Sequence, residues 1–122
     1  MHKYKDLIVW NKSIELVSMI YTLTTNYPEK EKFGLISQIN RCAVSIPSNI
    51  AEGAGRNSQK DFSNFLGIAT GSSYELETQI IISSKLGYIS TEKANQVLSL
   101  IEEIQKMLFS LKKKNLTPTN LN

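Results

Sequence analysis

The feature that most constrains the fold of this chain is an apolar seam in its last third. Six apolar residues recur there at steps of three and four: Ala94, Val97, Ile101, Ile104, Leu108 and Leu111. This spacing places them along one side of an amphipathic α-helix, which we expect over residues 91–113. Ser90 or Thr91 can cap the free backbone N–H groups at its start. The helix therefore has one buried side, which requires partners elsewhere in the chain.

Two earlier segments show the same helical spacing. One helix is expected over residues 6–26, ahead of Pro28, and the next from residue 31 to residue 53 or 55. The predicted inner face of the first comprises Trp10, Ile14, Val17 and Tyr21, broadened by Leu16, Met19, Ile20 and Leu23. That of the second comprises Ile36, Ile39, Ala43, Ile46 and Ile50. Pro47 predicts a kink in the second helix, because proline removes one helical hydrogen bond.

The remaining segment predicts a helix from Ser58 to about Leu86, where Gly87 supplies a left-handed stop. Asp61 follows Ser58 at the spacing of a short capping box. One side of this helix comprises Phe62, Leu66, Ala69, Ser73, Leu76, Ile80 and Ser83. A neighbouring side comprises Phe65, Ile68, Ser72, Gln79, Ile82 and Leu86. Because these two sides cover more than half of the circumference, we expect a contact surface beyond the bundle core.

Four amphipathic helices joined by short connections must turn back on one another. The predicted fold is therefore an all-α, antiparallel, up-down-up-down four-helix bundle. The chain of 122 residues is long enough for one core, and we expect a single domain over residues 1–116 with a flexible tail at 117–122. Strand signals are scarce, since no Asn-Gly or Asp-Gly turn is present.

The residues that commonly carry catalysis or bind metals are almost absent. The chain has one cysteine, Cys42, and one histidine, His2, too few for a disulfide framework, a common zinc site or a di-iron site. No nucleophile, base and orienting group can be assembled from them. We predict a protein that is not an enzyme, with no cofactor, metal, catalytic residue or small-molecule substrate. The single cysteine fits a reducing cytoplasm, and no apolar run approaches the ~18 residues of a membrane span, so we expect a cytoplasmic protein without membrane contact.

A polar stripe runs beside the apolar face of the second helix. Its members are spaced by threes and fours: Gly34, Gln38, Arg41, Ser45, Asn49, Glu52 and Arg56. Amide, hydroxyl and guanidinium groups bond specifically across tight surfaces, whereas exposed helix faces more often carry Lys and Glu. The stripe is therefore either a solvated face of unusual composition or a contact between helices or subunits. In the second case we expect Arg41 and Arg56 to pair with Glu52, Glu75 or Glu77.

Small residues on the third helix lie where a second backbone could approach. They are Gly67, Gly71, Ser72 and Ser73. Glycine within a helix costs about 1 kcal/mol relative to alanine, so two of them suggest a packing reason. The candidate subunit interface accordingly combines Gln38, Arg41, Ser45, Asn49, Glu52, Arg56, Gly71, Ser72 and Glu75.

Several stretches resemble the four-helix bundle family encoded by bacterial 23S rRNA intervening sequences. They are LIVW at 7–10, YPEKE at 27–31, QINRCAVSIPSNIAEG at 38–53 and GSSYELETQ at 71–79, with Phe65, Leu66 and Ala69 between the last two. The resemblance runs from residue 4 to about residue 90. It implies a homopentameric, barrel-like assembly with no assigned catalytic activity. A related branch resembles the accessory protein of diversity-generating retroelements, a basic pentamer that binds nucleic acid and a reverse transcriptase.

The leading hypothesis is thus a homo-oligomeric interaction or scaffold protein. The alternative is binding of RNA or DNA by basic patches that add up over the oligomer. A net charge of +3 per chain would give about +15 over five copies (5 × 3), enough to hold a polyanion with marked salt dependence. The candidate contacts are Arg56 and the lysines Lys3, Lys5, Lys12, Lys60, Lys112, Lys113 and Lys114.

Overall fold

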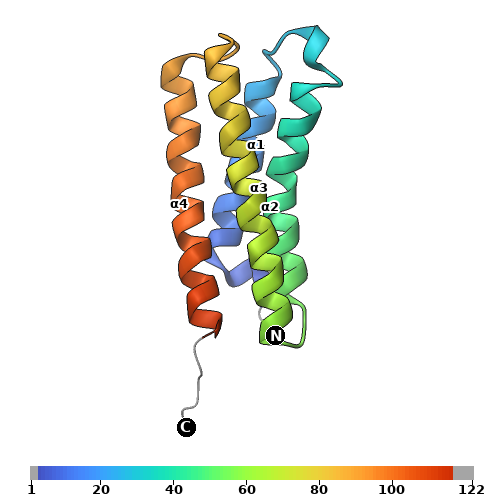
Figure 1. The fold of residues 1–122 in the computed structure, drawn as a ribbon, viewed down its shortest axis with the longest axis vertical. Helices are drawn as coiled ribbons and strands as arrows, with labels where there is room; N and C mark the ends of the chain where they lie inside the picture. The colour runs from blue at the N-terminus through green and yellow to red at the C-terminus, as the bar shows by residue number, and fades with distance from the viewer. Residues whose placement is uncertain (1–2, 117–122) are drawn as a thin grey trace.

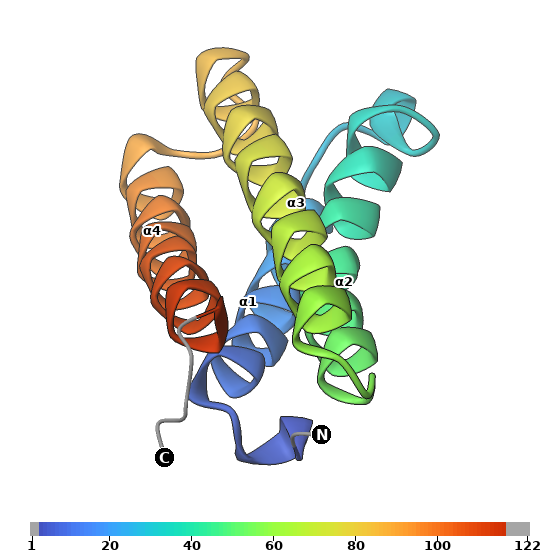
Figure 2. The ribbon, with the colours of Figure 1, turned by 60° about the horizontal axis from the view of Figure 1, so that its bottom comes forward.

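The computed structural model describes residues 3–116, so the tail predicted at 117–122 lies outside the described residues. Four antiparallel helices form a bundle: α1 (Ile8–Thr24), α2 (Leu35–Ala54), α3 (Gln59–Lys85) and α4 (Thr91–Leu116) (Figure 1). Each helix packs on its neighbours in chain order, and α4 closes on α1. The helices α1 and α3 therefore stand at opposite corners, with α3 between α2 and α4 (Figure 2). The predicted all-α four-helix bundle is confirmed.

The helix ends follow the signals in the sequence. The Ser58 Oγ accepts a hydrogen bond from the Asp61 backbone N–H at 3.0 Å, and the Ser90 Oγ accepts one from the Lys93 N–H at 3.1 Å. Gly87 adopts a φ of 79°, a left-handed conformation that ends α3 without strain. These local contacts fix where α3 and α4 begin and where α3 stops.

The core is built from one face of each helix. Its fully buried side chains include Leu16, Ile20, Ile39, Ile46, Ile50, Leu66, Leu76, Ile80, Ile101, Ile104 and Leu108. The predicted inner faces of α3 and α4 lie within it, apart from Leu111 at the edge, which is half-buried. Burial of these aliphatic groups is the main force that holds the bundle together.

The prediction for α1 needs correction. The helix starts at Ile8 and ends at Thr24, because residues 4–6 form a separate 3₁₀ turn. Ile14 and Tyr21 are exposed, whereas Val9, Ser13, Leu16, Ile20, Leu23 and Thr24 are buried. The two apolar rows of α1 overlap, and the row predicted as the broadening side is the one that faces the core.

The start of α2 also differs from the prediction. Residues 29–31 form a 3₁₀ turn, and the helix begins four residues later, at Leu35. Its first turn is capped by the Glu31 carboxylate, whose Oε1 accepts a hydrogen bond from the Leu35 N–H at 3.1 Å. The buried Pro47 lies inside α2, which continues on both sides of it to Ala54.

A hydrogen bond closes the end of the bundle opposite the N-terminus. The Tyr88 hydroxyl, in the α3–α4 connection, donates to Glu31 Oε2 at 2.8 Å. The ring of Tyr27 lies 5.4 Å from that of Tyr88, centroid to centroid. The hydrogen bond from the Leu35 N–H and then that from Tyr88 lower the pKa of Glu31 below its usual value. One carboxylate thus ties both connections at this end together.

Candidate contact surface on α2 and α3

The polar stripe of α2 divides into two rows. Ser45 and Asn49 are half-buried against α3, whereas Gln38, Arg41, Glu52 and Arg56 are exposed. The Ser45 Oγ lies 2.8 Å from the Ser72 Oγ of α3, within hydrogen-bond distance. Asn49 Nδ2 donates to the Ser45 carbonyl at 2.8 Å and to its Oγ at 2.9 Å. The inner row therefore belongs to a helix contact within one chain, and the outer row faces solvent.

The ion pairs expected across the stripe are largely absent from the described residues. Arg56 pairs at 2.8 Å with Glu52, four residues before it in the chain. Its guanidinium carbon lies 4.9 Å from the centre of the Phe65 ring. Exposed pairs of this kind contribute little to stability. Within residues 3–116, Arg41 forms no ion pair, and Glu77 accepts a hydrogen bond from Gln105 instead.

A second polar group lies deeper in the α2–α3 seam. Burial raises the pKa of the Cys42 thiol to about 11, and the neighbouring Glu75 carboxylate adds to the increase. The thiol is therefore protonated at neutral pH and a poor nucleophile. Gln79 contacts this group and is buried, and its Oε1 has no hydrogen-bond partner in the described part of the chain.

Glycines in α2 and α3 have different surroundings. A Cβ added at Gly53 would lie 2.6 Å from Phe65 Cβ, so this glycine is needed where α2 approaches the start of α3. A Cβ at Gly67 would meet the flexible end of Lys112 at 3.1 Å, and one at Gly71 would meet nothing within 4 Å. Nothing in the described chain accounts for a glycine at position 71.

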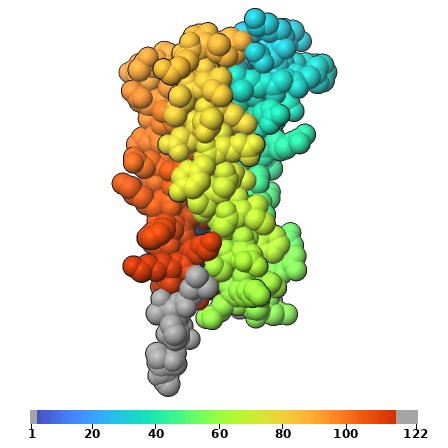
Figure 3. Space-filling model, viewed as in Figure 1, coloured from blue at the N-terminus to red at the C-terminus, as the bar shows by residue number. Residues whose placement is uncertain are grey.

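The outside of α3 carries most of the exposed aliphatic side chains of the bundle. Ile68 is 51% exposed and Leu86, just past the helix end, is 55% exposed. We call the following set the α3 outer face: Ile68, Gly71, Tyr74, Glu75, Ile81, Ile82 and Leu86, all of them exposed. Figure 3 views the molecule from this side, and α3 runs along it uncovered between α4 and α2. The sequence pattern predicts Ile68, Ile82 and Leu86 on a covered side, but the monomer leaves them open.

A second outer surface of the bundle has an apolar hollow between α1 and α2. Its volume is about 320 Å³. We call it the α1–α2 hollow; its lining includes Tyr4, Trp10, Ile14, Val17, Val44 and Pro47. Ile14, at 43% exposed, and Val44 form its open rim. The hollow therefore has room for a few apolar side chains of another molecule.

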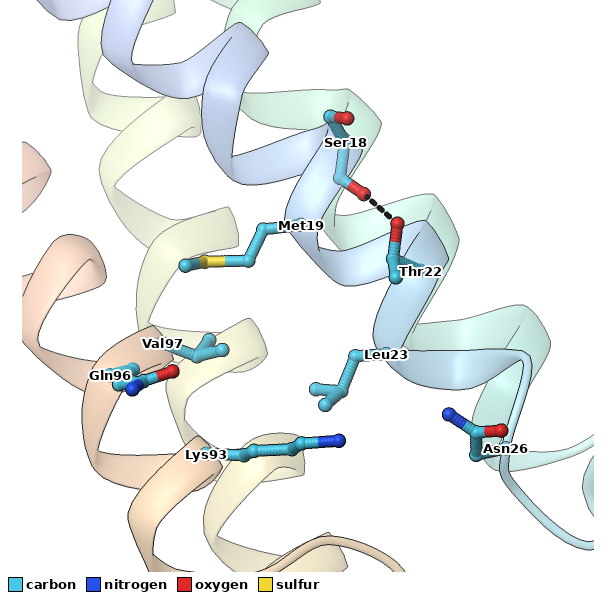
Figure 4. A pocket seen from close by; sticks show the side chains of 8 residues that line it. All are labelled: Ser18, Met19, Thr22, Leu23, Asn26, Lys93, Gln96 and Val97. Carbon is cyan, nitrogen blue, oxygen red and sulfur yellow. Dashed lines mark hydrogen bonds between the residues drawn. The ribbon is translucent and has the colours of Figure 1, made fainter.

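Another groove, of about 300 Å³, separates α1 from α4 (Figure 4). Met19, Leu23 and Val97 point toward one another across it, and Lys93 extends past Leu23 toward Asn26. Lys93 is the one charged residue among those that line it. No acid and base face each other there, and residues 3–116 contain no cluster of three His, Cys, Asp or Glu suited to a metal ion.

The basic residues predicted as nucleic-acid contacts gather mostly at one end of the bundle. This end, where the N-terminus, the α2–α3 turn and the end of α4 meet, is held by a 2.8 Å hydrogen bond from Asn115 Nδ2 to the Gln59 carbonyl (Figure 1). We call it the basic end: Lys3, Lys5, Arg56, Lys60, Lys112, Lys113 and Lys114, against the acidic Asp6, Glu52 and Asp61. Lys12 lies farther along α1 and pairs with Glu103 at 3.5 Å.

These features define an all-α four-helix bundle whose distinctive chemistry lies on its outer surfaces. Residues 5–110 match the sequence model of the family described as 23S rRNA-intervening sequence protein, and the chain belongs to that family. A crystal structure of a protein with unknown function from the S23 ribosomal protein family, from Bacteroides thetaiotaomicron, is similar. It shares 32% identity and a TM-score of 0.79 over 87% of this chain and 99% of that one.

No curated protein matches this chain. Among the described residues, none of the helices has the length and apolar character that a bilayer crossing requires.

Proposed function

We propose that this chain is a non-enzymatic subunit that assembles with copies of itself, as a homopentamer, and serves as a cytoplasmic scaffold for other macromolecules. The α3 outer face carries this proposal. Contiguous exposed aliphatic side chains are costly in water, and they commonly mark a surface that another protein covers. Ile68, Ile82 and Leu86 recur along one side of a single long helix, which suits a helix-to-helix contact between subunits.

One further observation supports a partner at this surface. Gly71, in the middle of the α3 outer face, lowers helix stability, and no packing contact among the described residues requires a glycine there. A second backbone that approaches closely would account for it.

The test is the mass of the purified, untagged protein by native mass spectrometry and sedimentation. We expect five copies for the wild type and a monomer for Ile82→Glu, because a charge on the α3 outer face cannot be buried without a partner. Ser99→Glu, on the exposed side of α4, is the matched control and should leave the mass unchanged. A monomeric wild type, or an Ile82→Glu variant that assembles normally, contradicts the proposal.

The basic end supports a second candidate function, the binding of RNA or DNA by the assembled protein. Cyclic symmetry places the same end of every subunit at one level, so the basic ends would form a continuous positive surface. The side of this end has a hollow of about 410 Å³, where Phe109, 69% exposed, lies beside Lys112 and Lys113. An exposed ring beside lysines is suited to an unpaired base and its phosphate.

Fluorescence anisotropy with a single-stranded RNA at low and high salt tests this second function. We expect binding at low salt that weakens steeply as salt rises. The double variant Lys112→Glu/Lys113→Glu should abolish it. Lys30→Glu/Lys32→Glu makes the same charge change at the opposite end and should retain more binding. Equal losses in the two double variants, or no binding by the wild type at low salt, would rule out a role for the basic end.

A further inference from the structure

We propose that the copies join head to tail, with the α3 outer face of one subunit seated in the α1–α2 hollow of the next. This inference rests on the proposed self-assembly and specifies the two surfaces that meet. A contact of the α3 outer face with the same face of a second copy would close into a two-fold dimer, so it could not join five copies and would leave the hollow open.

The shapes of the two surfaces favour the head-to-tail arrangement. Along the α3 outer face, Ile68 and Ile82 lie two turns to either side of Glu75, so aliphatic groups project from an exposed, convex helix. The α1–α2 hollow is concave, and its rim residues Ile14 and Val44 are exposed aliphatic groups as well. A ridge seated in a hollow buries more of both apolar surfaces than contact between two convex ridges does, and it excludes water from both.

The charges beside the two surfaces are complementary. Glu75 is exposed in the centre of the α3 outer face, on its α2 side, where its carboxylate also contacts the Cys42 thiol. Arg41 is exposed on α2, one turn from Val44 at the rim of the hollow. Within residues 3–116, neither side chain forms an ion pair. Head-to-tail contact would bring a carboxylate from one copy to a guanidinium of the next, while a two-fold contact through α3 would offer the carboxylate no opposite charge from that face.

The positions of the surfaces around the bundle favour ring closure. The α3 corner adjoins α2, and the α1–α2 hollow lies beyond α2, before the corner opposite α3. The two surfaces therefore point neither in the same direction nor in opposite directions. Repeated contacts between such surfaces turn steadily in one sense, and a closed ring results when the rotation divides a full circle.

Mixing two variants tests the proposal. Ile68→Glu blocks the α3 outer face, and Ile14→Glu blocks the hollow; both positions are exposed, so each variant should fold with wild-type helicity by circular dichroism. Each variant alone should be monomeric at a concentration where the wild type is fully assembled. An equimolar mixture should form a species with one copy of each variant and nothing larger, because one intact pair of surfaces remains. Ser18→Glu on α1 and Asn95→Glu on α4 are the controls and should assemble as the wild type does.

The possible failures are distinguishable by native mass spectrometry. A monomeric wild type would contradict the proposed self-assembly and, with it, the head-to-tail arrangement. A wild type that assembles, with an Ile14→Glu variant that assembles equally well, leaves self-assembly standing and overturns the role of the hollow. Ile68→Glu and Ile14→Glu monomers that fail to combine when mixed also overturn the head-to-tail arrangement.

Discussion

The helices α3 and α4 have similar interiors but different outer surfaces. Both present continuous rows of buried residues to the core. The exposed residues of α4 include Glu92, Lys93, Glu102, Glu103, Lys106, Lys113 and Lys114. From residue 64 to residue 86, α3 exposes only Glu75 and Lys85 among charged groups, together with the aliphatic and aromatic members of the α3 outer face. The core therefore explains the fold of both helices, while the outer composition of α3 requires a further explanation.

The largest expected effect tests whether the two interiors are equivalent. Leu76→Ala in α3 and Ile104→Ala in α4 each remove a fully buried side chain, and each should lower the free energy of unfolding by about 2–5 kcal/mol. Urea titration followed by circular dichroism at one protein concentration measures both losses. A loss below about 1 kcal/mol for either variant would show that its helix is not part of one cooperative core.

Gly53→Ala examines the inner contact of α3 with α2. The new Cβ would lie only 2.6 Å from Phe65 Cβ, so the two helices must move apart. We expect a loss of about 1–3 kcal/mol, as for other overpacked interiors. Gly55→Ala, where the nearest atom is 3.6 Å away, is the control in the same urea titration. Equal stability of the two variants would contradict the tight approach at Gly53.

Gly71→Ala should have opposite effects on the fold and on the assembly. The new methyl group meets nothing within 4 Å among residues 3–116, so alanine should stabilise α3 by about 1 kcal/mol through its higher helix propensity. The same methyl group should weaken a contact in which another backbone approaches position 71. Urea titration of the variant in an Ile82→Glu background, and sedimentation of the variant alone, separate the two effects. Unchanged assembly would mean that Gly71 lies outside the subunit contact.

The smallest expected effect concerns the Glu31–Tyr88 contact at the end of the bundle, away from the outer surfaces of α3 and α4. The folded pKa of Glu31 is below its unfolded value of 4.5, so its hydrogen bonds stabilise the protein above that pH, and this contribution is lost as pH falls through the folded pKa. Tyr88→Phe removes one of the two donors, and the fall in stability from about pH 6 to about pH 3 should become slightly shallower. Thermal unfolding at a series of pH values measures it. An identical pH profile for wild type and variant would contradict a role for this hydrogen bond.

Hydrophobic spacing was sufficient to predict most of the fold. The caps at Ser58 and Ser90, the stop at Gly87 and the inner rows of α3 and α4 depend on local sequence, and all of them are present. In α1, spacing was ambiguous because two apolar rows overlap. Contact with α2 and α4 decides which row of α1 is buried, and this contact depends on residues far from α1 in the sequence.

Sequence spacing placed most of the polar stripe on α2 but did not give its contacts, and its role as a subunit interface stays a prediction. The partner of Ser45, for example, depends on the height at which α3 passes α2, which local spacing does not contain. Arg56 is expected to pair with Glu52, Glu75 or Glu77 across a helix or subunit contact; it does pair with Glu52, but this residue lies four positions before it in the same chain. Whether Ile68 and Leu86 are exposed depends on which helices cover them. The sequence pattern therefore identifies them as apolar but does not show that the monomer leaves them exposed.

The Ser45–Ser72 hydrogen bond has a consequence for the alignment of the helices. Sliding α3 along α2 by one turn, about 5.4 Å, would bring Ser45 opposite Ile68 or Leu76 and leave both hydroxyls without each other. Apolar rows alone tolerate such a slip, because one aliphatic group replaces another. The paired hydroxyls therefore fix the axial register of α3 relative to α2. They thereby fix the position of Ile68, Gly71 and Glu75 along the bundle axis, where these residues face any partner outside the bundle.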